Sequence, residues 1–152
     1  MKIKQKTLSV IFDVDGGLVD TVPLHFQAWK EAYAENRIVF GHKEYEIING
    51  IPRDEGVRIT LGSAATPQRI KQIGDRKQQF YLMLLELNPP QILPGISALL
   101  SDMRRNGWSL AAASSSKNAA HVLAATGLTG CFDAIITGYD FHHPKPHPDI
   151  FL

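Results

Sequence analysis

The sequence predicts an α/β fold, a doubly wound parallel sheet with a block of helices inserted after its first strand. Strand-like apolar runs alternate with helical periodicities from about residue 91 to residue 137, the βαβ order of a parallel sheet. Another strand-like run stands at residues 8–12, and the stretch between reads as helices. We therefore expect a sheet domain of residues 1–20 and 91–152 and a helical domain of residues 21–90. The helical domain should form a cap over the carboxyl edge of the sheet, where open parallel sheets bind ligands.

The first strand and the first helix follow from apolar patterning. Leu8–Phe12 is a largely apolar run bounded by charge, which is typical of a short buried strand. Apolar side chains then recur at helical spacing from Val22 to Tyr33, and Pro23 suits the first turn of a helix. The pattern predicts a helix over residues 22–36.

The middle of the chain reads as helical pieces from about residue 43 to residue 88. Pro52 and Pro67 each stand where a piece begins, because proline fits the first turn of a helix. The run Asn88-Pro89-Pro90 ends the last piece, since proline restricts the residue before it and cannot continue a helix.

The last third of the chain alternates between the two kinds of element. We expect a helix from Pro94 to Gly107, a strand at Trp108–Ala113, a helix at Lys117–Thr126 and a strand at Phe132–Thr137. Together with the first strand, these elements complete the predicted parallel sheet.

Composition narrows the class of protein. The 152 residues carry 16 Lys and Arg against 15 Asp and Glu, so no strong field points to nucleic acid or to a membrane surface. No apolar run approaches the roughly 20 residues of a membrane span. Cys131 is the single cysteine, which leaves no disulfide framework and makes a reducing cytoplasm the default expectation. We interpret Cys131 as a small packed hydrophobe rather than a nucleophile.

Two carboxylates follow the first strand directly, in the run IFDVDGGLVDT. Side chains two apart on extended backbone face the same side, so Asp13 and Asp15 should face one point. One carboxylate can then attack while the other moves a proton, and both attract a hard cation. Gly16 and Gly17 let the backbone turn close to a ligand. The alternative interpretation is a solvated turn, since Asp and Gly are also turn residues.

Further candidate groups follow the other two strands. Ser114-Ser115-Ser116, with Lys117 and Asn118, offers hydroxyls and backbone amides that suit a phosphate at a helix start. The alternative is an ordinary capping cluster. Lys145 stands between prolines in HPKPHPDIF, as either a stiffly presented charge or a solvated loop lysine. His142, His143 and His147 allow a metal-binding tail, although histidines among prolines are more often plain loop residues.

Taken together, the motifs FDVDGGLVDT, LAAASSSKN and KPHPDIF resemble the haloacid dehalogenase superfamily. The runs DTVPLHFQAWK, GIPRDEG, DRKQQFYLMLL and LPG resemble its β-phosphoglucomutase-like group, which carries a helical cap after the first strand. The resemblance implies a Rossmann-like core and a Mg²⁺-dependent phosphoryl-transfer enzyme acting on a small sugar phosphate. It leaves a sugar-phosphate phosphatase of the same superfamily as an alternative.

The resemblance also implies roles for the residues after the strands. Asp13 would be the nucleophile that forms an aspartyl-phosphate, and Asp15 the general acid and base. The Asp13 carboxylate and the Asp15 main-chain carbonyl would hold Mg²⁺. Ser114 and Lys145 would neutralise the transferring phosphoryl group, which fits chemistry that depends on positioning and charge stabilisation.

Substrate-binding residues are implied within the cap as well. His25, with Trp29 one turn later, would help to place Asp15, and Arg53 would bind the distal phosphate, which its fork-shaped guanidinium suits. Lys77 falls on the apolar stripe of its helix, where a charge is costly unless it is paired or faces a polar cleft. Additional phosphate contacts are expected from Ser115, Lys117 and Asn118.

One departure from the family pattern concerns length. Family members continue beyond this point with an acidic motif that completes the Mg²⁺ site and with a strand that flanks the first strand. We therefore expect the C-terminal strands of the core to be missing and the first strand to be an apolar edge. A truncated gene product, a fragment of a longer enzyme and a strand-pairing dimer remain open as explanations. So does a truncated, non-catalytic remnant that only binds phosphates.

Overall fold

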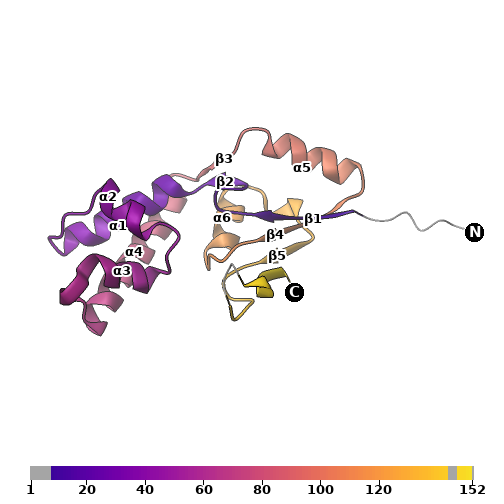
Figure 1. Cartoon of the computed structure of the whole chain (residues 1–152). Helices are drawn as coiled ribbons and strands as arrows, with labels where there is room; N and C mark the ends of the chain where they lie inside the picture. The colour runs from indigo at the N-terminus through magenta and orange to yellow at the C-terminus, as the bar shows by residue number, and fades with distance from the viewer. Residues whose placement is uncertain (1–7, 144–146, 152) are drawn as a thin grey trace, which may run out of the picture. The chain divides into compact units, whose positions relative to one another are not determined.

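The computed structural model describes residues 8–143 and 147–151, and the chain divides into two compact units. The sheet unit comprises Met1–Thr21 and Pro89–Leu152, and the helical unit comprises Val22–Asn88 (Figure 1). Among the helices of the described ranges, none combines the length and the apolar character needed to cross a membrane.

Parallel strands form the centre of the sheet unit. In the described part of the chain they are β1 (Ser9–Asp13), β4 (Ser109–Ala113) and β5 (Ala134–Ile136), in the order β1-β4-β5. β1 pairs with β4 over its whole length, and Ala111 of β4 faces Ala134 of β5. The predicted α/β class with a parallel sheet is thereby confirmed.

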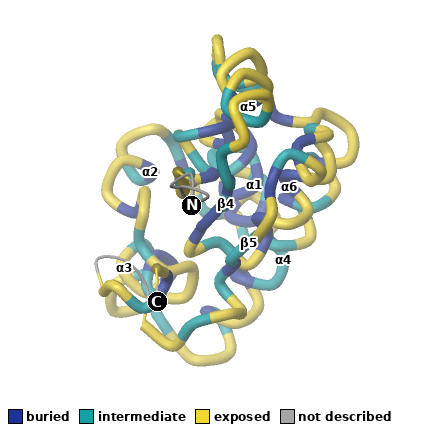
Figure 2. Tube along the Cα trace, turned by 90° about the vertical axis from the view of Figure 1, so that its right-hand side faces the viewer, coloured by how far each residue is buried: buried dark blue, intermediate teal, exposed yellow. Residues whose placement is uncertain are grey.

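Helices connect these strands. α5 (Ile96–Arg105) precedes β4, and α6 (Ala119–Ala125) leads from β4 toward β5. α5 is largely exposed and buries Leu100, whereas β4 buries Leu110 and Ala112 (Figure 2). β4 is therefore the buried centre of the described sheet.

β1 differs from the buried strand that its apolar run predicts. Ile11 is 50% exposed, and Val10 and Phe12 are only partly buried. The physical reason is that β1, within the described residues, has a pairing neighbour on one side only, namely β4.

A short antiparallel ribbon was not predicted from the sequence. β2 (Val19–Asp20) pairs with β3 (Gln91–Ile92), and the backbone N–H of Leu93 donates to the Leu18 carbonyl at 2.9 Å. Strands of two residues have no periodicity to detect, so only the tertiary contact reveals them. The ribbon joins the two points at which the chain leaves and re-enters the sheet unit.

The helical unit contains four α-helices within its described residues, α1 (Val22–Glu35), α2 (His42–Ile48), α3 (Arg53–Leu61) and α4 (Pro67–Leu87). Thr66 caps α4 by accepting the Arg69 backbone N–H on its hydroxyl, and Pro67 follows as the first helical residue. Shorter 3₁₀ turns lie at Gly62–Ala64, Thr129–Cys131 and Pro148–Phe151.

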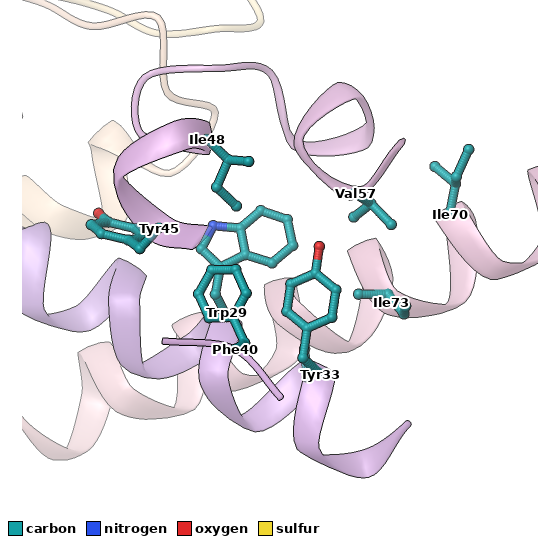
Figure 3. Packing of buried hydrophobic residues seen from close by; sticks show 9 residues of the cluster. Trp29, Tyr33, Phe40, Tyr45, Ile48, Val57, Ile70 and Ile73 are labelled. Carbon is teal, nitrogen blue, oxygen red and sulfur yellow. The ribbon is translucent and has the colours of Figure 1, made fainter. Parts of the chain in front are cut away.

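Aromatic packing gives the helical unit its own core (Figure 3). Tyr33 stacks on Phe40 with ring centroids 4.7 Å apart, and Trp29 stacks on Tyr33 at 5.6 Å. Aliphatic residues from α2, α3 and α4 close the cluster, namely Ile48, Val57, Ile70 and Ile73.

Candidate functional site

The carboxyl ends of the parallel strands meet at one edge of the sheet unit. Asp13 ends β1 opposite Ala113, the last residue of β4, and Ala113 faces Ile136 at the end of β5. The residues that follow these ends, including Asp15 and Ser114, therefore share the edge at which open parallel sheets place their chemistry.

Two hydroxyl groups fix the carboxylate of Asp15. The Thr21 hydroxyl donates to Oδ1 at 2.8 Å, and the Ser114 hydroxyl donates to Oδ2 at 2.8 Å. Both donors are 2% exposed, and they come from segments far apart in the sequence. Hydrogen bonds to an ionised group are the stronger kind, so this carboxylate is held in one orientation.

Thr21 is a site residue that the sequence interpretation missed. It lies within the run FDVDGGLVDT, but no feature of the spacing assigns its hydroxyl to Asp15. Only the tight turn between them brings the two side chains together. Gly17 permits that turn, because a Cβ at this position would lie 2.3 Å from the Asp13 carbonyl oxygen.

Asp13 is exposed at the end of β1, two residues before Asp15. The carboxylates of Asp13 and Asp15 and the hydroxyls of Thr21 and Ser114 offer oxygen atoms at this edge. Mg²⁺ prefers oxygen ligands, so the residues present fit the cation that the sequence predicted.

The serine run forms a turn whose polar groups bond largely to one another. The Ser116 backbone N–H donates to the Ser114 hydroxyl at 3.0 Å, and the Asn118 backbone N–H donates to the Ser116 hydroxyl at 3.1 Å. These are local serine turns before α6, whose N-cap residue Asn118 makes no side-chain capping bond, so the structure does not show the capping role left open as an alternative. Ser115 and Lys117 are exposed, with Lys117 Nζ 5.2 Å from the centre of the Tyr139 ring, whereas Asn118 is 8% exposed.

The loop after β5 supports this turn. Gly138 donates its backbone N–H to the Ser116 carbonyl at 3.1 Å, and a Cβ at Gly138 would lie 2.5 Å from the Ser115 carbonyl oxygen. Asp140 accepts the backbone N–H and the hydroxyl of Thr137, and these hydrogen bonds lower the pKa of Asp140. The sequence assigned no role to this loop, since close backbone approach leaves no trace in spacing.

A second cluster lies inside the helical unit. Lys77 Nζ lies 2.9 Å from His25 Nδ1, and the His25 ring stacks on Tyr81 with centroids 4.3 Å apart. Lys77 Nζ also lies 4.7 Å from the centre of the Tyr81 ring and 5.4 Å from that of Trp29. Lys77 is only 6% exposed, and its buried charge is balanced by the His25 nitrogen and by two aromatic rings.

This environment keeps His25 neutral. Burial first, and the neighbouring Lys77 charge second, lower the pKa of His25 from 6.5 to about 3. An ammonium has no lone pair, so Nδ1 accepts and the imidazole proton lies on Nε2. Trp29, predicted to bind substrate, is 6% exposed and packs in the aromatic core of the unit.

Arg53 begins α3 and lies beside acidic partners. Its Nε is 2.9 Å from Asp54 Oδ1, and its Nη2 is 3.9 Å from Asp75 Oδ1. With Arg58 and Lys71 it lines an open cavity of about 700 Å³ in the helical unit. Each of these cations has an acidic partner, Asp54 for Arg53, Glu55 for Arg58 and Asp75 for Lys71, and the Arg53 side chain is still 39% exposed to an incoming anionic group.

The predicted site residues thus divide between the two units. Asp13, Asp15 and Ser114 meet at the sheet edge, and Ser115, Lys117 and Asn118 follow in the same turn. His25, Trp29, Arg53 and Lys77 belong to the helical unit. Lys145 lies outside the described residues, so its assignment as a catalytic lysine stays a prediction.

Known proteins resemble this chain in sequence and in fold. The β-phosphoglucomutase of Bacillus subtilis (strain 168) is 36% identical over 150 residues, which are 95% of this chain and 66% of that protein. The fructose-1-phosphate phosphatase YqaB of Escherichia coli (strain K12) is 30% identical over 151 residues, 97% of this chain and 78% of that protein.

A solved structure agrees with these similarities. The crystal structure of β-phosphoglucomutase from Clostridium difficile superposes with a TM-score of 0.78 at 31% identity, covering 97% of this chain and 68% of that chain. The chain thus spans about two thirds of the length of each of these two β-phosphoglucomutases. Residues 8–152 match the family sequence model of the haloacid dehalogenase-like hydrolases, and the chain therefore belongs to that hydrolase family.

Proposed function

We propose that this protein transfers the phosphoryl group of a small sugar phosphate through an aspartyl-phosphate on Asp13. The proposal rests on the carboxylate of Asp15, which follows the exposed Asp13 by two residues. Its two oxygens accept hydrogen bonds from the hydroxyls of Thr21 and Ser114. Such an arrangement gives one exposed nucleophile and one oriented proton carrier. The similarity to a β-phosphoglucomutase and to a fructose-1-phosphate phosphatase supports a sugar phosphate as substrate.

The proposed first step uses both carboxylates. A carboxylate oxygen of Asp13 attacks the phosphorus atom and forms an oxygen–phosphorus bond, while the bond from phosphorus to the substrate oxygen breaks. Asp15 gives its proton to that leaving oxygen. In the second step an acceptor hydroxyl loses its proton to Asp15 and its oxygen attacks the phosphorus atom, while the bond from phosphorus to the Asp13 oxygen breaks. This restores the Asp13 carboxylate and the protonated Asp15.

Thr21 and Ser114 act in this scheme by holding Asp15 toward the reacting oxygen. Their hydroxyls come from different segments, so the carboxyl group cannot rotate without breaking one of two hydrogen bonds. Positioning of this kind is a large part of phosphoryl-transfer catalysis.

Mg²⁺ is the proposed cofactor, held by the Asp13 carboxylate and the Asp15 main-chain carbonyl. When bound, it would supply positive charge against the phosphoryl oxygens. Ser114 and Lys145 would add donors to the same oxygens, and Ser115, Lys117 and Asn118 are proposed as further phosphate contacts.

Substrate recognition is assigned to residues of the helical unit. Arg53, which lines the open cavity of the helical unit, and Lys77, held beside His25 and Trp29, are proposed to bind the substrate and its non-reacting phosphate. A guanidinium matches the geometry of phosphate oxygens, which supports Arg53 in this role.

The acceptor hydroxyl separates the two candidate reactions. A sugar hydroxyl makes the protein a β-phosphoglucomutase-like isomerase, and water makes it a phosphatase. The 36% identity to a β-phosphoglucomutase favours the first, and the similarity to a phosphatase keeps the second. Conversion of a hexose 1-phosphate that depends on added sugar bisphosphate indicates the mutase, whereas release of inorganic phosphate indicates the phosphatase.

The test is Mg²⁺-dependent turnover of a panel of hexose phosphates by the chain and by Asp13→Asn. We expect turnover that Asp13→Asn abolishes and that Asp102→Asn leaves unchanged, because Asp102 is an exposed carboxylate paired with Arg105 on α5. Folded protein without turnover on any substrate would contradict the proposal and favour a non-catalytic, phosphate-binding remnant.

A further inference from the structure

Two imidazoles and one carboxylate converge near the end of the described chain. His143 Nδ1 lies 2.9 Å from Asp149 Oδ2, and His147 Nδ1 lies 3.5 Å from Asp149 Oδ1. One ligand atom from each of the three residues lies within 4.8 Å of the others. The rings of His143 and His147 are 4.6 Å apart between centroids.

The carboxylate is fixed in place by its own surroundings. The His143 backbone N–H donates to Asp149 Oδ2 at 3.0 Å, and the Asp149 backbone N–H donates to His147 Nδ1 at 3.2 Å. The 3₁₀ turn Pro148–Phe151 that carries Asp149 is anchored by Ile150, which is 4% exposed. Asp149 therefore stands between the two imidazoles before any ligand arrives.

The donor set and its spacing match a transition metal. Two imidazole nitrogens and one carboxylate oxygen form a common protein ligand set for Zn²⁺, with metal–ligand bonds of about 2.0–2.2 Å. Tetrahedral bonds of that length place neighbouring ligand atoms roughly 3.3 Å apart. The 2.9 Å separation joins His143 Nδ1 to Asp149 Oδ2, and the 3.5 Å separation joins His147 Nδ1 to Asp149 Oδ1. Both lie near that value, so a cation that replaces the hydrogen bonds at the two nitrogens can be bound after small side-chain rotations.

This set differs from the three histidines that the sequence indicated. His142 is not part of the cluster, and Asp149 takes its place. The cluster also differs chemically from the carboxylates of Asp13 and Asp15, which offer only oxygen, because imidazole nitrogens favour Zn²⁺ over Mg²⁺.

We propose that His143, His147 and Asp149 bind one Zn²⁺ ion or a similar divalent transition metal. With three protein ligands, the site leaves a fourth position to water or to an anionic oxygen, as zinc sites with an open position do. None of the three residues is a proposed Mg²⁺ ligand, and metal binding by them does not require that the chain be catalytically active.

The experiment is isothermal titration of the full chain with Zn²⁺ in excess Mg²⁺. We expect one Zn²⁺ ion per chain, and affinity lowered at least tenfold by His143→Ala, His147→Ala or Asp149→Asn. His121→Ala is the matched control, because His121 is an exposed histidine on α6, and it should bind as the unaltered chain does.

Two further arms make the result decisive. Asp13→Asn should bind Zn²⁺ unchanged, so a failure of the proposed catalytic function does not affect this test. Circular dichroism of each variant checks that it is folded. The double variant His143→Gln with His147→Gln removes both imidazoles while keeping polar side chains, so its loss of binding is not a loss of surface polarity. Absence of stoichiometric binding, or equal affinity in the folded variants and the unaltered chain, overturns the proposal.

Discussion

Lys77 Nζ lies 2.9 Å from His25 Nδ1, so a buried charge on α4 is bound to a neutral imidazole on α1. The stacked ring of Tyr81 covers one face of that imidazole and also faces Lys77. A protonated His25 would therefore be both buried and next to a like charge. The pair stabilises the helical unit only while His25 remains neutral.

The stability of the protein should accordingly fall as the solution becomes mildly acidic. The pKa of His25 is about 3 in the folded protein and 6.5 in the unfolded chain, so the unfolded state binds the proton first. The contribution of neutral His25 to the free energy of unfolding is fully present above about pH 6.5 and is lost as the pH falls toward about 3. Between about pH 7 and about pH 5 we expect a loss of about 2 kcal/mol, measured by urea unfolding.

His25→Gln tests the assignment of that loss. Carboxylates with lowered pKa values, such as Asp133, titrate below their ordinary value of 3.8. They therefore contribute little to the change in stability between about pH 7 and about pH 5, which we assign to His25. The variant should show little dependence on pH above about pH 5, whereas His121→Gln should keep the full dependence. A His25→Gln curve parallel to that of the unaltered chain would count against the assignment.

Lys77→Met separates the two causes of the lowered pKa. Removing the Lys77 charge should raise the pKa of His25, but burial is the larger cause and persists, so the value should stay below 6.5. Titration of the imidazole protons by NMR measures this directly. A pKa at or above 6.5 in the variant would mean that the charge, not burial, dominates.

The two hydroxyls on Asp15 should act as a unit. Loss of a hydrogen bond to a charged group costs about 1.5–3 kcal/mol, so Thr21→Val and Ser114→Ala should each lower kcat by roughly tenfold or more. In an Asp15→Asn background Thr21→Val should have much less effect, because the proton carrier that it positions is gone, whereas Ser114→Ala should keep the part of its effect that comes from the proposed contact with the phosphoryl oxygens. Thr126→Val is the matched control, since the Thr126 hydroxyl bonds only to carbonyls within α6.

Gly138→Ala should damage the turn that carries Ser114. The new Cβ would meet the Ser115 carbonyl oxygen at 2.5 Å, and backbone cannot yield as a flexible side chain can. We expect a loss of roughly 1–3 kcal/mol in unfolding free energy together with a lower kcat. Gly130→Ala, which meets nothing within 4 Å, should change neither quantity, and equal behaviour of the two variants would contradict this account.

Much of the sheet unit could be predicted because its signals are local. Apolar runs marked β1, β4 and β5 to within one or two residues, and prolines marked the beginning of α4. Burial was less predictable: the apolar run of β1 indicated a buried strand, yet Ile11 is half exposed. Burial depends on neighbours, which a run of residues does not specify.

The site shows the same division between local and tertiary information. The position of Asp13 and Asp15 after a strand was readable from the sequence, but the hydroxyl of Thr21 on Asp15 was not. Lys77 on an apolar stripe indicated a paired charge, and only the structure identifies His25, 52 residues away, as its partner. Side-chain pairs at such separations follow from helix packing and leave no spacing pattern.

The ribbon of β2 and β3 has a consequence for how the chain can be divided. Asp20 lies opposite Gln91, so the two ends of the sheet unit that lead into Val22–Asn88 are already side by side. A linker of a few residues could join them without stretching the sheet. The helical block is thus inserted as a module between two strands that already pair with each other. Replacing it with another block should leave the order and the pairing of the strands in the sheet unit unchanged.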